Sequence, residues 1–124
     1  MKILSALLWV LVFSLPAYAD SPTGQEINSM MLRSEARTAP SGAEGSDFQA
    51  GAYEGYIMGV SDGLMGTSLY YYCAPPKADR AQLRTVVTKY LKTHQRDLHV
   101  PAGALVTAAL IEAFPCKKKP HDND

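Results

Sequence analysis

Few residues of this 124-residue chain have the types and spacing that catalysis requires. Ser61, Asp62 and His94 together could supply a nucleophile and its base, but the serine sits among residues with helical spacing and not in the surroundings of a nucleophile elbow. His94, His99 and His121 could ligate zinc, yet they lie in a polar connector and in the terminal tail. The glycines also keep helical spacing, unlike those of a phosphate-binding loop. We therefore expect no catalytic residue, no metal and no cofactor.

The N-terminus predicts export. A short positive start precedes an uninterrupted apolar run over residues 3–15, and the small residues Ala17 and Ala19 then mark a cleavage site. The run is too short to span a bilayer, which takes about 20 residues. We expect residues 1–19 to be a signal peptide that is cleaved after Ala19, which leaves a periplasmic protein starting at Asp20 with no membrane attachment.

The rest of the chain has the size and charge of one near-neutral domain. From Asp20 onward it has 105 residues, with 11 basic and 12 acidic side chains once Lys2 is removed. A pI near 6.8 is not that of a nucleic-acid-binding protein. We expect residues 20–116 to form the domain and residues 117–124, which begin with three lysines, to be a disordered polar tail.

The two cysteines, Cys73 and Cys116, both fall in the exported part of the chain. An even number of cysteines in an oxidising compartment predicts a disulfide, and two cysteines allow one intramolecular pairing. Closing a loop of about 44 residues should stabilise the fold by about 4 kcal/mol in the chain-entropy model. A metal site or a redox pair would need closer spacing or more ligands.

The spacing of apolar residues predicts an all-α fold, a small bundle of about four helices closed by this disulfide. Thr23 can cap the first helix, and Asp79 can cap the third, with Gln82 three residues on as in a capping box. Pro101 suits the first turn of the fourth helix, and Pro115 ends it. The predicted helices are residues 24–37, about 47–65, 80–93 and 101–114.

The second predicted helix carries glycine at every fourth position, namely Gly51, Gly55, Gly59 and Gly63. Beside this row lies a second one of apolar or small residues, Phe48, Ala52, Tyr56, Val60 and Leu64. Glycine costs a helix interior about 0.8–1 kcal/mol relative to alanine, so we expect the glycine row to allow close packing. The two rows together predict a wide buried face. We expect Gly55 and Gly59 to lie closest to the alanine-rich fourth helix, and the other two to face another helix or a second copy of the chain.

Two short segments could form a partner-binding surface. Three consecutive tyrosines at residues 70–72 either pack over the disulfide or expose at least one ring as an interface anchor. The polar residues 94–99 form either a solvated loop or a projection that contacts a partner. The candidate contact residues are Tyr70, Tyr71, His94, Gln95, Arg96 and Asp97.

Four stretches carry a family resemblance through their order along residues 48–116. They are "GAYEGYIMGVSDG", "YCAPP", "QLRTVVTKYLKTH" and "ALVTAALIEAFPC". The most specific pieces are the glycine helix, the step Cys73-Ala74-Pro75 and the closing "AFPC". In this order they resemble the Tai-type (Rap/Tai) immunity proteins of type VI secretion. The chain departs from that pattern at Gln95, where a proline is expected after the histidine.

The resemblance implies an all-helical periplasmic protein that binds a peptidoglycan amidase effector, a cysteine peptidase of stem peptides, and protects the cell from self or sibling intoxication. It also implies a homodimer, loops that reach into the active-site groove of the effector, and the disulfide between Cys73 and Cys116. Two other function classes fit the residues: an acid-stress periplasmic chaperone and a small periplasmic hydrolase. The export signal, the order of the motifs and the missing catalytic set favour the immunity protein.

Overall fold

The structure is a computed structural model that describes residues 20–36, 46–67 and 71–117. Within these ranges the helices are α2 (Gly24–Ala36), α3 (Ser46–Gly66), α4 (Arg80–Thr93) and α5 (Ala102–Ala113), and the 3-10 turn η1 (Gln95–Asp97) precedes α5. The same ranges contain no strand, only two isolated bridges, so the predicted all-α bundle is confirmed. The predicted signal peptide, residues 1–19, and the predicted tail after Lys117 lie outside the described residues.

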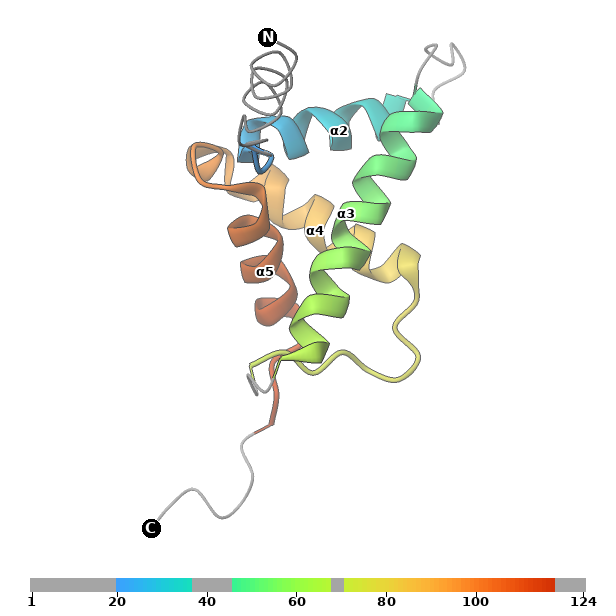
Figure 1. Cartoon of the computed structure of the whole chain (residues 1–124), viewed down its shortest axis with the longest axis vertical. Coiled ribbons are helices and arrows are strands. Elements are labelled where there is room, and N and C mark those ends of the chain that lie inside the picture. The colour runs from blue at the N-terminus through green and yellow to red at the C-terminus, as the bar shows by residue number, and fades with distance from the viewer. Residues whose placement is uncertain (1–19, 37–45, 68–70, 118–124) are drawn as a thin grey trace, which may run out of the picture.

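Helices α3 and α5 form the centre of the bundle, because each of them packs against all three other α-helices of the described residues. In Figure 1, α2 lies across the end at which α3 begins, α5 runs alongside α3, and α4 crosses behind both. The starts of these helices follow from local chemistry. The Asp79 carboxylate accepts a hydrogen bond of 2.7 Å from the Gln82 N–H at the start of α4, as the predicted cap requires.

Helix α2 begins with a reciprocal pair of hydrogen bonds. The Glu26 N–H donates to the Thr23 hydroxyl over 3.2 Å, and the Glu26 carboxylate accepts from the Thr23 N–H over 2.6 Å. The carboxylate accepts from both the Thr23 N–H and, over 3.0 Å, the Thr23 hydroxyl, and these two bonds to the charged form hold the pKa of Glu26 below its usual value. Thr23 is therefore the cap that the sequence predicts, and Glu26 completes a capping box.

The core consists of the large side chains on one side of each helix. Along α3, the buried positions are Ala50, Tyr53, Ile57 and Ser61. The other helices add Ile27, Met31, Leu83, Val87, Leu91, Ala102, Leu105, Val106, Ala109 and Leu110. Full burial of one large apolar side chain stabilises the fold by about 1.5–3 kcal/mol relative to leaving it exposed. These side chains therefore decide how each helix is rotated about its axis.

The prediction of which face of α3 is buried is wrong. The four glycines of the row, Gly51, Gly55, Gly59 and Gly63, are all exposed, and a Cβ atom built on any of them would meet nothing within 4 Å. Phe48, which was expected on the buried face, is 76 % exposed. The predicted close packing of Gly55 and Gly59 against α5 does not occur within this chain, whereas the contact with a second copy stays a prediction.

Side-chain size explains this rotation of α3. Gly55 and Ile57 lie about 200° apart around the helix, so they cannot both face the core. Burying Tyr53 and Ile57 removes far more apolar surface from water than a row without side chains could. The neighbouring row is half-buried at its edge, where Tyr56 approaches α5: its hydroxyl lies 3.3 Å from a Cβ built on Gly103.

The start of α2 is hydrogen-bonded to the segment that connects α4 to α5. The Gly24 N–H donates to the Val100 carbonyl over 2.8 Å. A Cβ atom on Gly24 would lie 2.6 Å from both the Leu98 carbonyl oxygen and the Leu105 Cδ1. Side chains do not fit at such distances, so Gly24 lets two backbones meet in the way that was expected of the glycine row of α3.

Tyr53 links α3 to α4 in the core. Its ring is fully buried, and its hydroxyl lies 3.0 Å from the Thr88 Oγ1. Burial disfavours the charged phenolate and raises the pKa of Tyr53 to about 12. In the unfolded chain the pKa returns to its ordinary value near 10.0.

We expect Tyr53→Phe to flatten the alkaline loss of stability. Because the pKa of Tyr53 is higher in the folded than in the unfolded chain, its hydroxyl adds to the free energy of unfolding in full below pH 10. This addition, about 3 kcal/mol, is lost as the pH rises from 10 toward 12. The variant should also unfold about 1 kcal/mol more easily at neutral pH because the hydroxyl bond is missing. Urea unfolding across this pH range tests both effects, with the exposed Tyr71→Phe as control. An equally steep alkaline decline in Tyr53→Phe and wild type would contradict the assignment.

Candidate functional site

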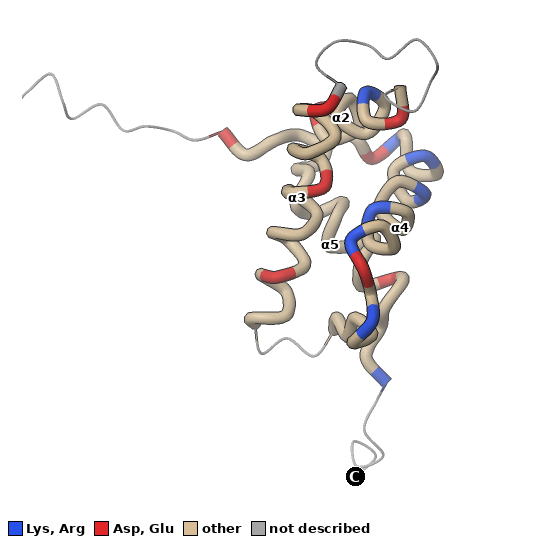
Figure 2. The backbone as a smooth tube through the Cα atoms, turned by 90° about the vertical axis from the view of Figure 1, so that its right-hand side faces the viewer, with Lys and Arg blue, Asp and Glu red and all other residues tan. Residues whose placement is uncertain are grey.

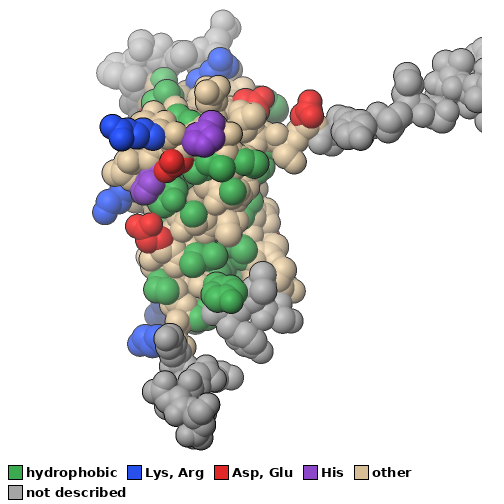
Figure 3. Space-filling model, turned by 90° about the vertical axis from the view of Figure 1, so that its left-hand side faces the viewer, with side chains coloured by type: hydrophobic (Ala, Val, Ile, Leu, Met, Phe, Trp, Pro, Cys, Tyr) green, Lys and Arg blue, Asp and Glu red, His purple; other side chains and the backbone are tan. Residues whose placement is uncertain are grey.

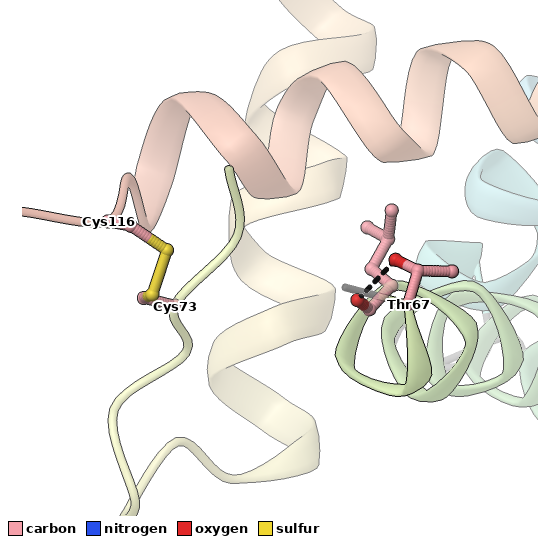
Figure 4. The surroundings of a disulfide bond; sticks show 4 residues. Thr67, Cys73 and Cys116 are labelled. Carbon is pink, nitrogen blue, oxygen red and sulfur yellow. Dashed lines mark hydrogen bonds between the residues drawn. A yellow bond between two sulfur atoms is a disulfide. The ribbon is translucent and has the colours of Figure 1, made fainter. Parts of the chain in front are cut away.

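The predicted disulfide is present and ties the middle of the α3–α4 connection, residues 67–79, to the segment that follows α5 (Figure 4). Cys73 and Cys116 have Cα atoms 4.8 Å apart and lie 43 positions apart in the sequence. Beside the bond, the Cys73 N–H donates to the Phe114 carbonyl over 2.9 Å, and Tyr72 pairs with Pro115 in an isolated bridge. We call this region, residues 71–75 and 114–116, the disulfide end of the bundle.

Ser61, Asp62 and His94, which the sequence analysis considered as a triad and did not favour, lie in separate surroundings. The sequence analysis overlooked that residues 59–63 have the Gly-x-Ser-x-Gly spacing of a nucleophile elbow, but Ser61 lies inside α3 and is 1 % exposed. Its hydroxyl lies 2.8 Å from the Tyr72 hydroxyl, which fastens the disulfide end to α3. Asp62 faces solvent, and His94 stacks on Tyr90 at the far end of α4. Ser61 therefore has a structural role.

The tyrosines before Cys73 divide between the two alternatives that the sequence leaves open. Tyr72 is buried and packs edge-on against Phe114, with ring centroids 6.3 Å apart. Tyr71 is 65 % exposed, so its ring is available to a partner. Tyr70 lies outside the described residues. Met65 in the last turn of α3 is also exposed, and sequence reasoning did not single it out.

The connector between α4 and α5, residues 94–100, is a compact turn. His94 ends α4: its ring stacks on Tyr90 with centroids 3.8 Å apart, and its Nδ1–H donates to the Tyr90 carbonyl over 2.9 Å. The Asp97 N–H donates to the His94 carbonyl, and the Val100 N–H donates to the Asp97 carbonyl, each over 3.0 Å. The backbone of the connector is therefore fixed by its own hydrogen bonds.

Gln95 anchors the connector to the rest of the bundle. Its side-chain amide donates to the Asn28 Oδ1 of α2 over 3.2 Å and to the Leu91 carbonyl of α4 over 2.7 Å. Arg96 is exposed and Asp97 is half-buried. Gln95, where the resemblance led us to expect a proline, thus has a structural role, while Arg96 and Asp97 reach the surface.

The predicted contact residues form two separate groups. Arg96 and Asp97 precede α5, whereas Tyr71 lies at the disulfide end, beyond the last turn of α5. Helix α5 has 12 residues and is thus about 18 Å long. The face over α5 between the two groups gathers hydrophobic side chains (Figure 3). A single small ligand could not reach both groups, but a protein surface could.

The described residues offer no site for a metal ion. No group of three or more His, Cys, Asp or Glu side chains among them could hold one. His121, which the sequence offered as a third histidine, lies outside the described residues. No helix in the described part of the chain is long and apolar enough to cross a bilayer.

These features define a class: a small, disulfide-closed helical protein whose candidate site is a surface for another protein. The chain matches the family model of the Rap1a immunity proteins over residues 23–116, and it belongs to that family. The match confirms the Rap/Tai resemblance that the glycine helix and the cysteine motifs carry. No curated protein and no solved structure matches the chain.

Proposed function

We propose that the protein is a periplasmic immunity protein that binds a type VI secreted peptidoglycan amidase, a cysteine peptidase, and occludes its active site. The observation that carries this proposal is the match to the Rap1a immunity proteins over residues 23–116. The signal-like N-terminus and the Cys73–Cys116 disulfide support the compartment, because such bonds persist in the oxidising periplasm. The amidase acts on peptidoglycan in that same compartment, so an inhibitor must fold there.

The stiffness of the connector between α4 and α5 suits a segment that enters and blocks an active-site groove. A segment that already holds its bound conformation loses less entropy when it enters a groove, so more of its contact energy appears as affinity. The backbone bonds of residues 94–100 and the Gln95 anchor supply that stiffness. Arg96 and Asp97 then present a cation and an anion at fixed positions to polar groups of the amidase.

Protection of living cells tests the proposal. A peptidoglycan amidase encoded beside this gene, directed to the periplasm, should lyse the host, and co-expression of the full chain should restore growth. A version without residues 2–19 should not protect, because it would stay in the cytoplasm. Lysis that continues despite full-length protein in the periplasm would contradict the proposal.

We expect Arg96→Ala and Asp97→Ala each to weaken binding to this amidase by about tenfold or more, as central charged contacts do. Neither change removes a buried group, so the free energy of unfolding should move by no more than about 0.5 kcal/mol. Calorimetric titration and urea unfolding provide the two measurements. Arg33→Ala and Asp20→Ala remove the same charges from other exposed positions and should leave the affinity unchanged. Unchanged affinity in Arg96→Ala and Asp97→Ala would remove the connector from the contact surface.

We also propose that the protein is a homodimer in which the glycine face of α3 meets a second copy. Four exposed glycines destabilise an isolated helix by about 3–4 kcal/mol relative to alanine, and close contact with another backbone is what glycine permits. Phe48 lies on the same side of α3, seven residues before Gly55, and could anchor the contact. The family resemblance also favours a dimer.

Light scattering at micromolar concentration should give the mass of a dimer for the wild type. Gly55→Leu and Gly59→Leu should give a monomer mass, because a leucine side chain would hold the two helices apart. Ala81→Leu places the same side chain on an exposed part of α4 and should remain dimeric. A monomer mass for the wild type would disprove the dimer without touching the proposal on amidase binding.

A further inference from the structure

The chain just before α2 is paired with the end of the connector (Figure 1). We call residues 20–23, which precede α2, the N-terminal strap. The Ala102 N–H donates to the Pro22 carbonyl over 2.9 Å, and the Gly24 N–H donates to the Val100 carbonyl over 2.8 Å. Each side thus gives one donor and one acceptor, as in an antiparallel ladder, and the strap is held at the entrance of α5.

This pairing leaves no backbone donor without a use. Thr23 and Pro101 face each other in an antiparallel bridge, in the register whose hydrogen bonds come from the flanking residues. Proline has no N–H, and this is a position of the ladder at which none is needed. The Thr23 N–H donates to the Glu26 carboxylate instead. The strap therefore has one defined register against the connector.

The connector is attached to the N-terminal part of the chain at two places. Val100, which accepts from Gly24, also donates its N–H to the Asp97 carbonyl over 3.0 Å, so the paired residue closes the turn. The other attachment is the hydrogen bond of 3.2 Å from Gln95 to Asn28 of α2. The two charged residues of the connector lie between these attachments in the sequence. The strap and α2 together therefore fix the backbone that carries both charges.

The side chains of the strap offer little to a partner. Between Asp20 and α2 they are those of a serine, a proline and a threonine, which are small and uncharged (Figure 2). None of the strap residues belongs to the buried core. What the strap contributes is therefore backbone pairing, at the place where the proposed contact segment is attached.

We propose that the N-terminal strap is a positioning element for amidase binding, which holds the connector in the conformation in which Arg96 and Asp97 meet the amidase. This inference rests on the proposed function. A connector released from the strap samples other conformations, and the apparent affinity falls in proportion to the fraction that keeps the binding conformation. The expected cleavage after Ala19 leaves the strap whole, because the strap begins at the next residue.

Two chains that differ by one residue test the role of the strap. A chain that begins at Pro22 keeps the carbonyl that accepts from Ala102, whereas a chain that begins at Thr23 lacks it. Neither chain loses a buried side chain, and both keep the Thr23 cap of α2. Each is compared with the expected mature chain by thermal unfolding, by hydrogen exchange of single amides, and by calorimetric titration with the amidase from whose toxicity the full chain protects cells.

The chain that begins at Pro22 should match the mature chain in all these measurements. In the chain that begins at Thr23, the amides of Asp97 and Val100 should lose most of their protection from exchange, and the affinity for the amidase should fall about tenfold. The amides of the core helices should keep their protection. The unfolding temperature should fall by no more than about 8 °C, because one hydrogen bond and no buried side chain is lost.

The same truncation in the Arg96→Ala/Asp97→Ala background shows whether the strap acts through the connector. There it should lower the affinity by no more than about twofold, because the contacts that the strap positions are already gone. An equal loss of affinity in both backgrounds would mean that the strap contacts the amidase itself, and this would overturn the inference.

Three other results would also overturn it. Unchanged exchange of the connector amides, or unchanged affinity despite their faster exchange, would do so while leaving amidase binding intact. Loss of protection in all the helices at once would make the strap an element of overall stability and not of positioning. A mature chain that fails to bind the amidase would instead overturn the proposed function, and this inference with it.

Discussion

Replacing Cys73 and Cys116 together by serine is expected to lower the free energy of unfolding by about 4 kcal/mol. The bond closes a loop that spans 43 positions, and this loop contains all of α4 and α5. Without the bond, the unfolded chain gains the entropy that the closed loop withholds. Small domains are stable by only about 5–15 kcal/mol, so the loss removes a large share of the total.

The effect of the serine variant should be global, because the disulfide end joins three parts of the fold. The Tyr72 hydroxyl is hydrogen-bonded to Ser61 of α3, and the Tyr72 ring packs against Phe114. The backbone N–H of Cys73 donates to the carbonyl of Phe114. Urea unfolding of oxidised wild type, reduced wild type and the double variant gives the measurement. The reduced wild type is the matched control and should unfold like the double variant. Equal stability of the double variant and the oxidised wild type would show that the bond does not hold the bundle together.

Gly24→Ala is expected to destabilise the fold by about 2–3 kcal/mol, as overpacking does. The added Cβ would lie 2.6 Å from the Leu98 carbonyl oxygen, which belongs to the backbone and cannot rotate away. The clash can be removed only if the start of α2 moves away from the connector. This movement would stretch the hydrogen bond from the Gly24 N–H to the Val100 carbonyl.

Gly103→Ala is the matched control for this change, since it also adds one methyl group to a glycine in the first turn of a helix. Its Cβ would meet only the Tyr56 hydroxyl, at 3.3 Å, and a side-chain end can shift by a few tenths of an ångström. The gain in helix propensity should then offset most of the strain. Urea unfolding of the two variants should separate them by about 2 kcal/mol or more. Equal stabilities would contradict the close approach at Gly24.

The helices could be predicted from the sequence because their signals are local. Asp79 and Gln82 lie within one turn of each other, and Pro101 and Pro115 bracket α5. Their hydrogen bonds and backbone restrictions need no distant partner. The disulfide was predicted from two cysteines in a chain that its N-terminus leads us to expect outside the cytoplasm, and two cysteines allow one intramolecular pairing whatever the fold.

The rotation of α3 and the role of Gly24 depend on distant residues, so the sequence pattern could not supply them. The sequence analysis placed two neighbouring rows of small or apolar residues on the buried face, but the row that contains Tyr53 and Ile57 is buried instead, because these side chains pack against the other helices. Gly24 is constrained by Leu98 and Leu105, far along the chain. A glycine directly after a helix cap, where no turn calls for one, was the signal that could have pointed to a close contact.

The candidate contact surface likewise combines features that local sequence predicts with features that depend on distant residues. The polar composition of residues 94–97 marked them as a possible contact loop, but the bond from Gln95 to Asn28 crosses 67 positions and makes that loop stiff. The cations of α4 could be assigned to its exposed face from helical spacing. The ion pairs of Arg84 with Glu54 of α3 and of Lys92 with Glu35 of α2 could not, because each pair joins residues that lie far apart in the sequence.

Titration of a purified amidase with the mature chain tests the central claim most directly. The type VI amidase from whose toxicity the chain protects cells is assayed on peptidoglycan stem peptides while the oxidised protein, residues 20–124, is added in increasing amounts. Hydrolysis should fall to zero at stoichiometric amounts, and substrate should compete with the inhibitor, because the active site is covered. Undiminished hydrolysis in the presence of excess folded, oxidised protein would contradict it.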